Sequence, residues 1–174
     1  MTTRNNIIGK LDWWLLKLYL ALVVIGISTI YAAAFNEAHP SLFDMSQHYG
    51  KQALFVGVSL FVGFVIILID AKFFNAFAYI IYGFSILLLI YVLVGGTTIA
   101  GSRSWIQIGG FSFQPSEFAK FGTALAVAHY LGNINTDFSK IKTQMITYAM
   151  VLLPVMLILA QGDAGSALVF LIFI

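Results

Sequence analysis

The stretch WWLLKLYLALVVIGISTIYAAAF, residues 13–35, decides the fold class of this chain. It holds a single charge, Lys17, near its start, and at ~1.5 Å rise per residue it is long enough to cross a hydrocarbon core of ~30 Å. Arg4 and Lys10 precede it, but the apolar run is too long for a secretory signal peptide. The stretch therefore predicts a retained first membrane span.

The whole chain of 174 residues has the composition of an integral membrane protein. Hydrophobic residues make up 60% of it and charged residues 9%, whereas a soluble domain has about 25% charged residues. The basic residues are scattered and the net charge is only +2, so we exclude a nucleic-acid partner. The chain contains no cysteine, which excludes disulfides, thiolate metal sites and a cysteine nucleophile.

Polar loops divide the rest of the chain into further apolar segments. We expect spans at about 52–69, 73–94, 114–131 and 144–160, and the start of a sixth at 164–174. The sequence therefore predicts an all-α transmembrane bundle in a single domain over 1–174, with about five complete spans and part of another. The chain ends inside the apolar run LVFLIFI, which favours the amino-terminal portion of a longer protein.

The basic residues of the loops predict the orientation in the membrane. Alternating spans put five of them on one side and two on the other: Arg4, Lys10, Lys72, Lys140 and Lys142 against Lys51 and Arg103. The side richer in Lys and Arg normally faces the cytoplasm. We therefore expect a cytoplasmic N-terminus, with the loops at 36–50 and 97–116 on the outer side of the membrane.

The densest group of chemically useful residues lies between the third and fourth spans. The segment GSRSW carries Arg103 and Trp105, and the segment QPSEFAK carries Glu117 and Lys120. Glu117 and Lys120 are three positions apart, so they share a helix face and can pair where the helix begins. Two interpretations stay open: an interfacial ion pair with a helix cap, or a polar cavity in which Arg103 and Lys120 hold phosphate.

The stretch GSRSWIQIGGFSFQPSEFAK resembles the GARxWxxxG and QPSExxK signature of the SEDS family (RodA, FtsW and SpoVE), which polymerises peptidoglycan glycan strands from lipid II. The matching residues are Gly101, Arg103, Trp105, Gly109, Gln114, Pro115, Ser116, Glu117 and Lys120. The resemblance implies a fold of about ten spans. It also implies a substrate cavity shaped by Arg103, Trp105, Gln114, Ser116, Glu117 and Lys120.

A second resemblance lies in QGDAGSA, residues 161–167, which occupies the place of the family's QPDLGTA. Gly162 stands where the family has proline and Ala164 where it has leucine, so we expect a looser turn here. Asp163 is retained, and two roles are open for it: it caps the next helix, since Asp is a favoured N-cap residue, or it lines the substrate cavity.

The resemblance implies a function and partners for the complete protein. We expect a RodA-like lipid II glycosyltransferase of the bacterial cytoplasmic membrane, acting in cell-wall elongation, cell shape and division. Its expected partners are a class B penicillin-binding protein and other membrane proteins of the elongation complex. The early Asp12-Trp13 and Lys51-Gln52 pairs resemble the RodA branch more than the FtsW branch.

The family's catalytic aspartate would fall after Ile174, so we expect no catalytic residue in this chain and no activity from it alone. A divalent cation is compatible with pyrophosphate chemistry, but no residue pattern indicates its ligands. A transporter or flippase for a lipid-linked precursor is one alternative function, although we find no internal repeat to favour it. A non-enzymatic membrane scaffold of the elongation machinery is another.

Overall fold

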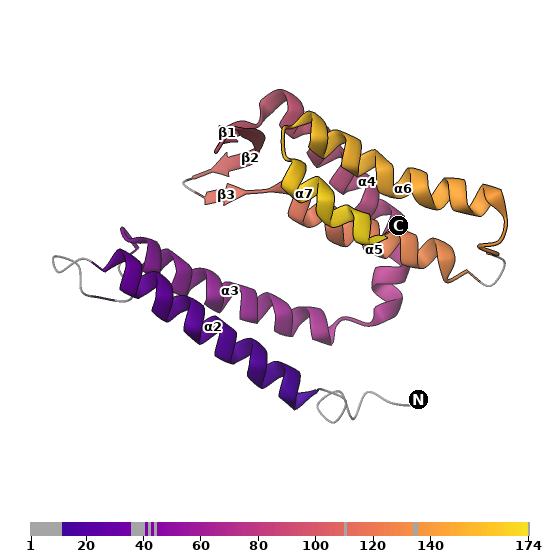
Figure 1. Cartoon of the computed structure of the whole chain (residues 1–174). Helices are drawn as coiled ribbons and strands as arrows, with labels where there is room; N and C mark the ends of the chain where they lie inside the picture. Colours follow the sequence, from indigo (N-terminus) through magenta and orange to yellow (C-terminus); the bar gives the residue numbers. More distant parts are fainter. Residues whose placement is uncertain are drawn as a thin grey trace. The chain divides into compact units, whose positions relative to one another are not determined.

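The computed structural model describes residues 12–35, 41, 43, 45–109, 111–133 and 136–173, and most of them are helical (Figure 1). The helices are α2 Trp13–Ala34, α3 His48–Leu68, α4 Ala71–Gly95, α5 Pro115–Leu131, α6 Ile141–Ala160, α7 Ala164–Val169 and the 3₁₀ turn η1 Phe170–Phe173. Every expected span corresponds to one of these helices. Arg4, Lys10 and most of the loop 36–50 lie outside the described residues.

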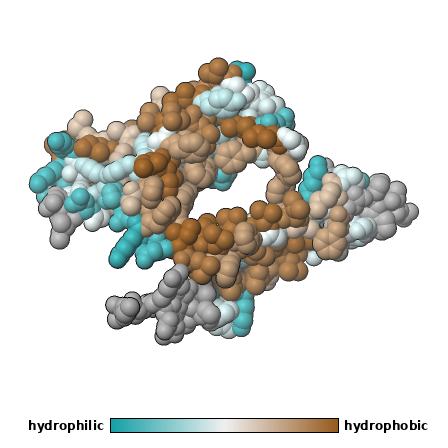
Figure 2. Space-filling model, turned by 180° about the vertical axis from the view of Figure 1, so that it is seen from behind, coloured by the Kyte–Doolittle hydropathy of each residue, from teal (hydrophilic) through white to brown (hydrophobic). Residues whose placement is uncertain are grey.

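Four of the described helices, α2, α3, α4 and α6, are long and apolar enough to cross a membrane. The fourth expected span, α5, has only 17 residues, about 25 Å of helix, which is at the lower limit for a span. Its bounds are set locally, because Pro115 occupies the first turn and Gly132 is the C-cap. Hydrophobic residues dominate the visible surface (Figure 2), and the polytopic all-α fold class is confirmed.

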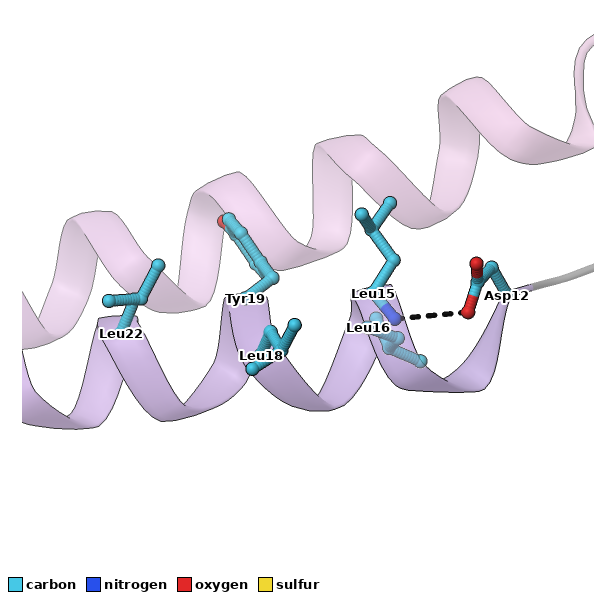
Figure 3. Close-up of a pocket in the computed structure, with 6 residues that line it drawn as sticks. All are labelled: Asp12, Leu15, Leu16, Leu18, Tyr19 and Leu22. Atoms are coloured by element: carbon cyan, nitrogen blue, oxygen red, sulfur yellow. Dashed lines mark hydrogen bonds between the residues drawn. The ribbon is translucent and has the colours of Figure 1, made fainter.

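The chain divides into two compact units, residues 1–69 and 70–174, so one domain over 1–174 stays a prediction. In the first unit, the rings of Tyr31 on α2 and Tyr49 on α3 pack edge to face, with centroids 5.2 Å apart. A shallow apolar pocket follows α2 (Figure 3), and it is lined by Asp12, Leu15, Leu16, Leu18, Tyr19 and Leu22. None of the predicted site residues lines this pocket.

In the second unit, α4 and α5 lie side by side in opposite directions. Gly122 meets Ser85 near the middle, and His129 meets Asn75 through a side-chain hydrogen bond farther along. A Cβ added at Gly122 would lie 2.9 Å from Ser85 Oγ, so any larger residue here would force the serine side chain or the helices to shift. The apolar core of the unit lies among α4, α5, α6, α7 and η1, and it includes Leu89, Ala119, Val151, Ile158, Ala167 and Phe170.

The segment between α4 and α5 is a small antiparallel sheet in the order β1-β2-β3, with β1 Thr97–Ile99, β2 Ser102–Ile108 and β3 Phe111–Phe113. Ala100 and Gly101, with φ of 50° and 87°, form the turn between β1 and β2. The loop expected at 97–116 is thus an ordered hairpin of β1 and β2, and β3 adds a third strand by pairing along β2. This sheet positions Arg103 and Trp105.

Candidate functional site

The residues singled out in the sequence gather at one end of the second unit, where β2 and the first turns of α5 and α7 lie (Figure 1). The backbone N–H of Arg103 on β2 donates to the carbonyl of Gln161 at the end of α6, at 2.9 Å. This bond brings the GSRSW and QGDAGSA segments together, although they are far apart in the sequence. The folded chain therefore joins its two motifs into one site.

The side chain of Arg103 caps the end of α4. Its Nε–H donates to the carbonyl of Gly96 at 3.0 Å, and Nη1 donates to the carbonyl of Leu93 at 3.4 Å. The last carbonyls of a helix have no partner within the helix, and a cation there also complements the helix dipole. Arginine has five N–H donors, so this structural role leaves donors for an anion, and phosphate binding stays a prediction.

Trp105 belongs to the sheet itself. It is half-buried, and it lies opposite Thr97 in the register of β1 and β2. The neighbouring Ser104 is fully buried, with its Oγ 2.8 Å from Ser102 Oγ. The tryptophan is thus held by the strand pairing, and its predicted place at the substrate cavity is not tested by these contacts.

Glu117 and Lys120 form the ion pair that their spacing predicts. Lys120 Nζ lies 2.8 Å from Glu117 Oε1, and the side chains are 25% and 59% exposed for the lysine and the glutamate respectively. Glu117 also lies in the first turn of α5, where a carboxylate complements the positive end of the helix. Within the described residues the pair is open on the glutamate side, so its burial in a cavity stays a prediction.

The carboxylate of Asp163 joins the starts of α5 and α7. Its Oδ1 accepts from the backbone N–H of Ser166 at 3.0 Å, and its Oδ2 accepts from the hydroxyl of Ser166 at 2.7 Å. The same Oδ2 accepts from Gln114 Nε2 at 2.8 Å. The helix-cap role predicted for Asp163 is therefore confirmed, and Gln114 lies in the same hydrogen-bonded group.

The looser turn expected at Gly162 is wrong. The N–H of Gly162 donates to the carbonyl of Leu159 at 3.0 Å, and the N–H of Asp163 donates to the carbonyl of Ile158 at 3.2 Å. These two bonds make a Schellman motif, in which the residue after the C-cap takes a left-handed conformation. Gly162 has a φ of 78°, which glycine adopts easily and proline cannot.

Two buried polar side chains of the site keep atoms without a partner. Ser116 is fully buried, and its hydroxyl finds no hydrogen-bond partner among the described residues. Gln161 is 4% exposed, and its Nε2 donates to the carbonyl of Leu89 at 3.1 Å. Its Oε1 finds no partner in the part of the chain that the structure describes. Ser116 was predicted as a site residue, whereas Gln161 was not.

The carboxylates of the site do not form a cation site with the residues described. No group of three His, Asp or Glu side chains among those residues could hold a metal ion. Asp163 uses both oxygens in hydrogen bonds, and Glu117 pairs with Lys120. We therefore derive no step through a metal, and the divalent cation stays a prediction.

The sequence profile of the FtsW/RodA/SpoVE family, described as cell cycle protein, matches residues 12–174. The chain belongs to the FtsW/RodA/SpoVE family. The peptidoglycan glycosyltransferase RodA of Treponema pallidum is 35% identical over 165 residues, which cover 94% of this chain and 37% of that protein.

Two solved structures resemble this FtsW/RodA/SpoVE member along most of its length. The crystal structure of the rod shape determining protein RodA of Thermus thermophilus matches with a TM-score of 0.80 and 32% identity, over 93% of this chain and 50% of that one. A chain of a peptidoglycan synthase complex that coordinates polymerization and crosslinking matches with a TM-score of 0.78 and 31% identity, over 93% and 45%. The chain thus spans between about two fifths and half the length of these relatives.

Family membership, together with four helices that can cross a membrane, identifies a multi-pass bacterial membrane protein. Within this FtsW/RodA/SpoVE chain, sequence reasoning missed the Arg103 cap on α4 and the bond between Gln114 and Asp163. The cap depends on where α4 ends, seven to ten residues before Arg103, and the second bond joins residues 49 positions apart, so no residue spacing signals either. The turn at Gly162 did carry a local signal, because glycine directly after an apolar helix is typical of a Schellman motif.

Proposed function

We propose that the protein containing this chain is a RodA-like peptidoglycan glycosyltransferase that acts in cell-wall elongation, cell shape and division. It joins the disaccharide of lipid II to the growing glycan on the outer face of the membrane and releases the pyrophosphate carrier. The observation that carries this proposal is the Glu117–Lys120 ion pair at the start of α5, in a chain of the family whose Treponema relative is named a peptidoglycan glycosyltransferase.

The geometry supports a division of roles between two cations. As the glycosidic bond forms, the bond from the sugar to the pyrophosphate breaks, and negative charge develops on the leaving group. Lys120 supplies a compact positive charge, and Glu117 holds its ammonium in place at 2.8 Å. Arg103 supplies planar N–H donors, which suit phosphate oxygens. Fixed charges of this kind stabilise charge that develops in the transition state.

Proton transfer from the attacking hydroxyl belongs to another group. The proposal assigns it to the family's catalytic aspartate, which none of the motifs in this chain contains. Asp163 is not proposed for this role, because its carboxylate caps α7 and taking up a proton would weaken the three hydrogen bonds it accepts from Ser166 and Gln114. The present chain, taken alone, is therefore proposed to hold the substrate without polymerising it.

The proposal extends to orientation and partners. We propose a cytoplasmic N-terminus, because loops on that side of the expected topology carry more basic residues, and this puts the site at the outer surface. A class B penicillin-binding protein and other elongation-complex membrane proteins are the proposed partners. Support comes from the similarity to a chain of a peptidoglycan synthase complex.

The test uses the full-length protein, purified and supplied with lipid II in the absence of any other polymerase. We expect glycan chains, visible as a ladder after electrophoresis. A protein that moves labelled lipid II across vesicle membranes without making glycan would instead be a flippase. One that does neither, while retaining its partners in the membrane, would be a scaffold, and either result would overturn the proposal.

A further inference from the structure

We infer that Gln114 is a positioning residue, which ties the start of α5 to the start of α7 through Asp163. The two side chains therefore hold each other and do not bind substrate. The inference goes beyond the proposed function and rests on it in one respect, because it takes the Glu117–Lys120 pair as the part of the site that is positioned.

The side chain of Gln114 forms hydrogen bonds with the start of α7 and not with its own helix, α5. It occupies the N-cap position of α5 but makes no side-chain hydrogen bond to that helix. Instead, its Nε2 donates to Asp163 Oδ2 at 2.8 Å, with Ser166 Oγ at 3.3 Å. Glutamine is not among the residues favoured as N-caps. The side chain at this position thus serves the contact between helices and not the local cap.

The carboxylate of Asp163 accepts three hydrogen bonds from protein donors. One oxygen accepts the N–H of Ser166, and the other accepts both the Ser166 hydroxyl and the Gln114 amide. Hydrogen bonds to an ionised carboxylate are stronger than bonds between neutral groups. A carboxylate also repels the phosphates of an anionic substrate. Both points favour a link between α5 and α7 over a substrate contact. The hydrogen-bonded group of Gln114, Asp163 and Ser166 is called the latch below.

The latch acts on the ion pair through α5. Glu117 follows Gln114 by about one helical turn and Lys120 by about two, and Pro115 stiffens the backbone between Gln114 and that first turn. Below the latch, Ala119 of α5 shares an apolar core with Ala167 and Phe170. The polar and apolar contacts together fix where α5 begins, and so where Glu117 and Lys120 lie.

The test exchanges the two partners in the full-length protein. Gln114→Glu places two carboxylates against each other, and we expect lipid II polymerisation to fall about tenfold, within the coupling range for residues in contact. The double variant Gln114→Glu/Asp163→Asn exchanges amide and carboxylate, and asparagine is still a good N-cap. We expect it to recover most of the lost rate. Gln107→Glu, an exposed change on β2, is the matched control and should leave the rate unchanged.

A second readout does not depend on activity. The amide of Ser166 is protected by its bond to Asp163, so we expect hydrogen exchange in 164–169 to speed up in Gln114→Glu and to slow again in the double variant. If wild-type protein makes no glycan but this pattern holds, the proposed function fails and the latch stands. If the double variant is as impaired in exchange as the single one, the latch is overturned. If only polymerisation stays impaired while exchange recovers, Gln114 and Asp163 contact substrate and the inference is wrong.

Discussion

The backbone of Arg103 donates a hydrogen bond to the carbonyl of Gln161 at 2.9 Å. Through this bond β2 is attached to the end of α6, while the guanidinium of the same arginine caps α4. One residue thus holds together the ends of two helices and a strand. The guanidinium of Arg103, a proposed phosphate-binding group, is therefore held in place by hydrogen bonds to backbone carbonyls.

Replacing Arg103 separates its structural role from its proposed role in binding phosphate. Arg103→Ala removes two exposed hydrogen bonds, so we expect the free energy of unfolding to fall by about 0.5–1.5 kcal/mol. We expect polymerisation to fall by more than this loss of stability explains, because the positive charge proposed to bind phosphate also disappears. Thermal unfolding in detergent and lipid II turnover measure the two effects. Normal turnover in Arg103→Ala would leave the arginine with a capping role alone.

Gly162 is expected to be intolerant of the proline that the family has at this position. The left-handed φ of 78° costs an alanine about 1–2 kcal/mol, and proline, fixed near −65°, cannot adopt it. We therefore expect Gly162→Ala to lower the melting temperature and Gly162→Pro to lower it further. The control is Gly165→Ala, whose added Cβ would lie 3.8 Å from Asp163 Oδ1 in ordinary contact. A melting temperature unchanged by Gly162→Pro would contradict the Schellman turn.

Gly122 sets the close approach of α4 and α5. An alanine Cβ there would lie 2.9 Å from Ser85 Oγ and 3.4 Å from the carbonyl of Ile81, so we expect Gly122→Ala to cost about 1–3 kcal/mol. Adding Ser85→Ala should recover part of this loss, since it removes the nearest atom. Gly83→Ala, with nothing within 4 Å of its Cβ, is the control and should be tolerated. Equal stability of both alanine variants would disprove the tight helix crossing.

The membrane orientation can be tested with reporters fused to the full-length protein. We expect a reporter within 97–113 to lie outside the cytoplasm and one within 133–142 to lie inside, because α5 separates the two segments and the basic residues Lys140 and Lys142 favour the cytoplasm. The measurement is the activity of a reporter that works on one side only. Both reporters on the same side would show that α5, with its 17 residues, does not cross the membrane.

The sequence predicts the helices well because the apolar runs that form them are local and long. For α4, Ala71–Gly95, the expected span 73–94 agrees within two residues at each end. The expected start of α3 is less accurate: the helix begins at His48, four residues before the apolar run, because polar residues of the preceding loop join its first turn. Hydropathy reports burial in lipid and does not report where a helix begins in water.

The site is predicted less completely than the helices. The spacing of Glu117 and Lys120 is enough to predict their bond, since both lie on one helix. The bond from Gln114 to Asp163 joins residues 49 positions apart, and only the folded chain brings α5 and α7 together. The carbonyl partners of Arg103 are near in sequence, seven and ten positions away, but they become available only where α4 ends.

Lipid II polymerisation by Lys120→Ala full-length protein, at matched amounts of folded protein, tests the proposed function most directly. The pair is largely exposed on the glutamate side, and an exposed pair contributes only about 0–1 kcal/mol to stability. We therefore predict that Lys120→Ala has a melting temperature close to that of the wild type but loses polymerisation. The control Lys142→Ala, at the exposed start of α6, should keep both the wild-type melting temperature and the wild-type polymerisation rate. Near-normal polymerisation in Lys120→Ala would contradict a role for the ion pair in holding the substrate.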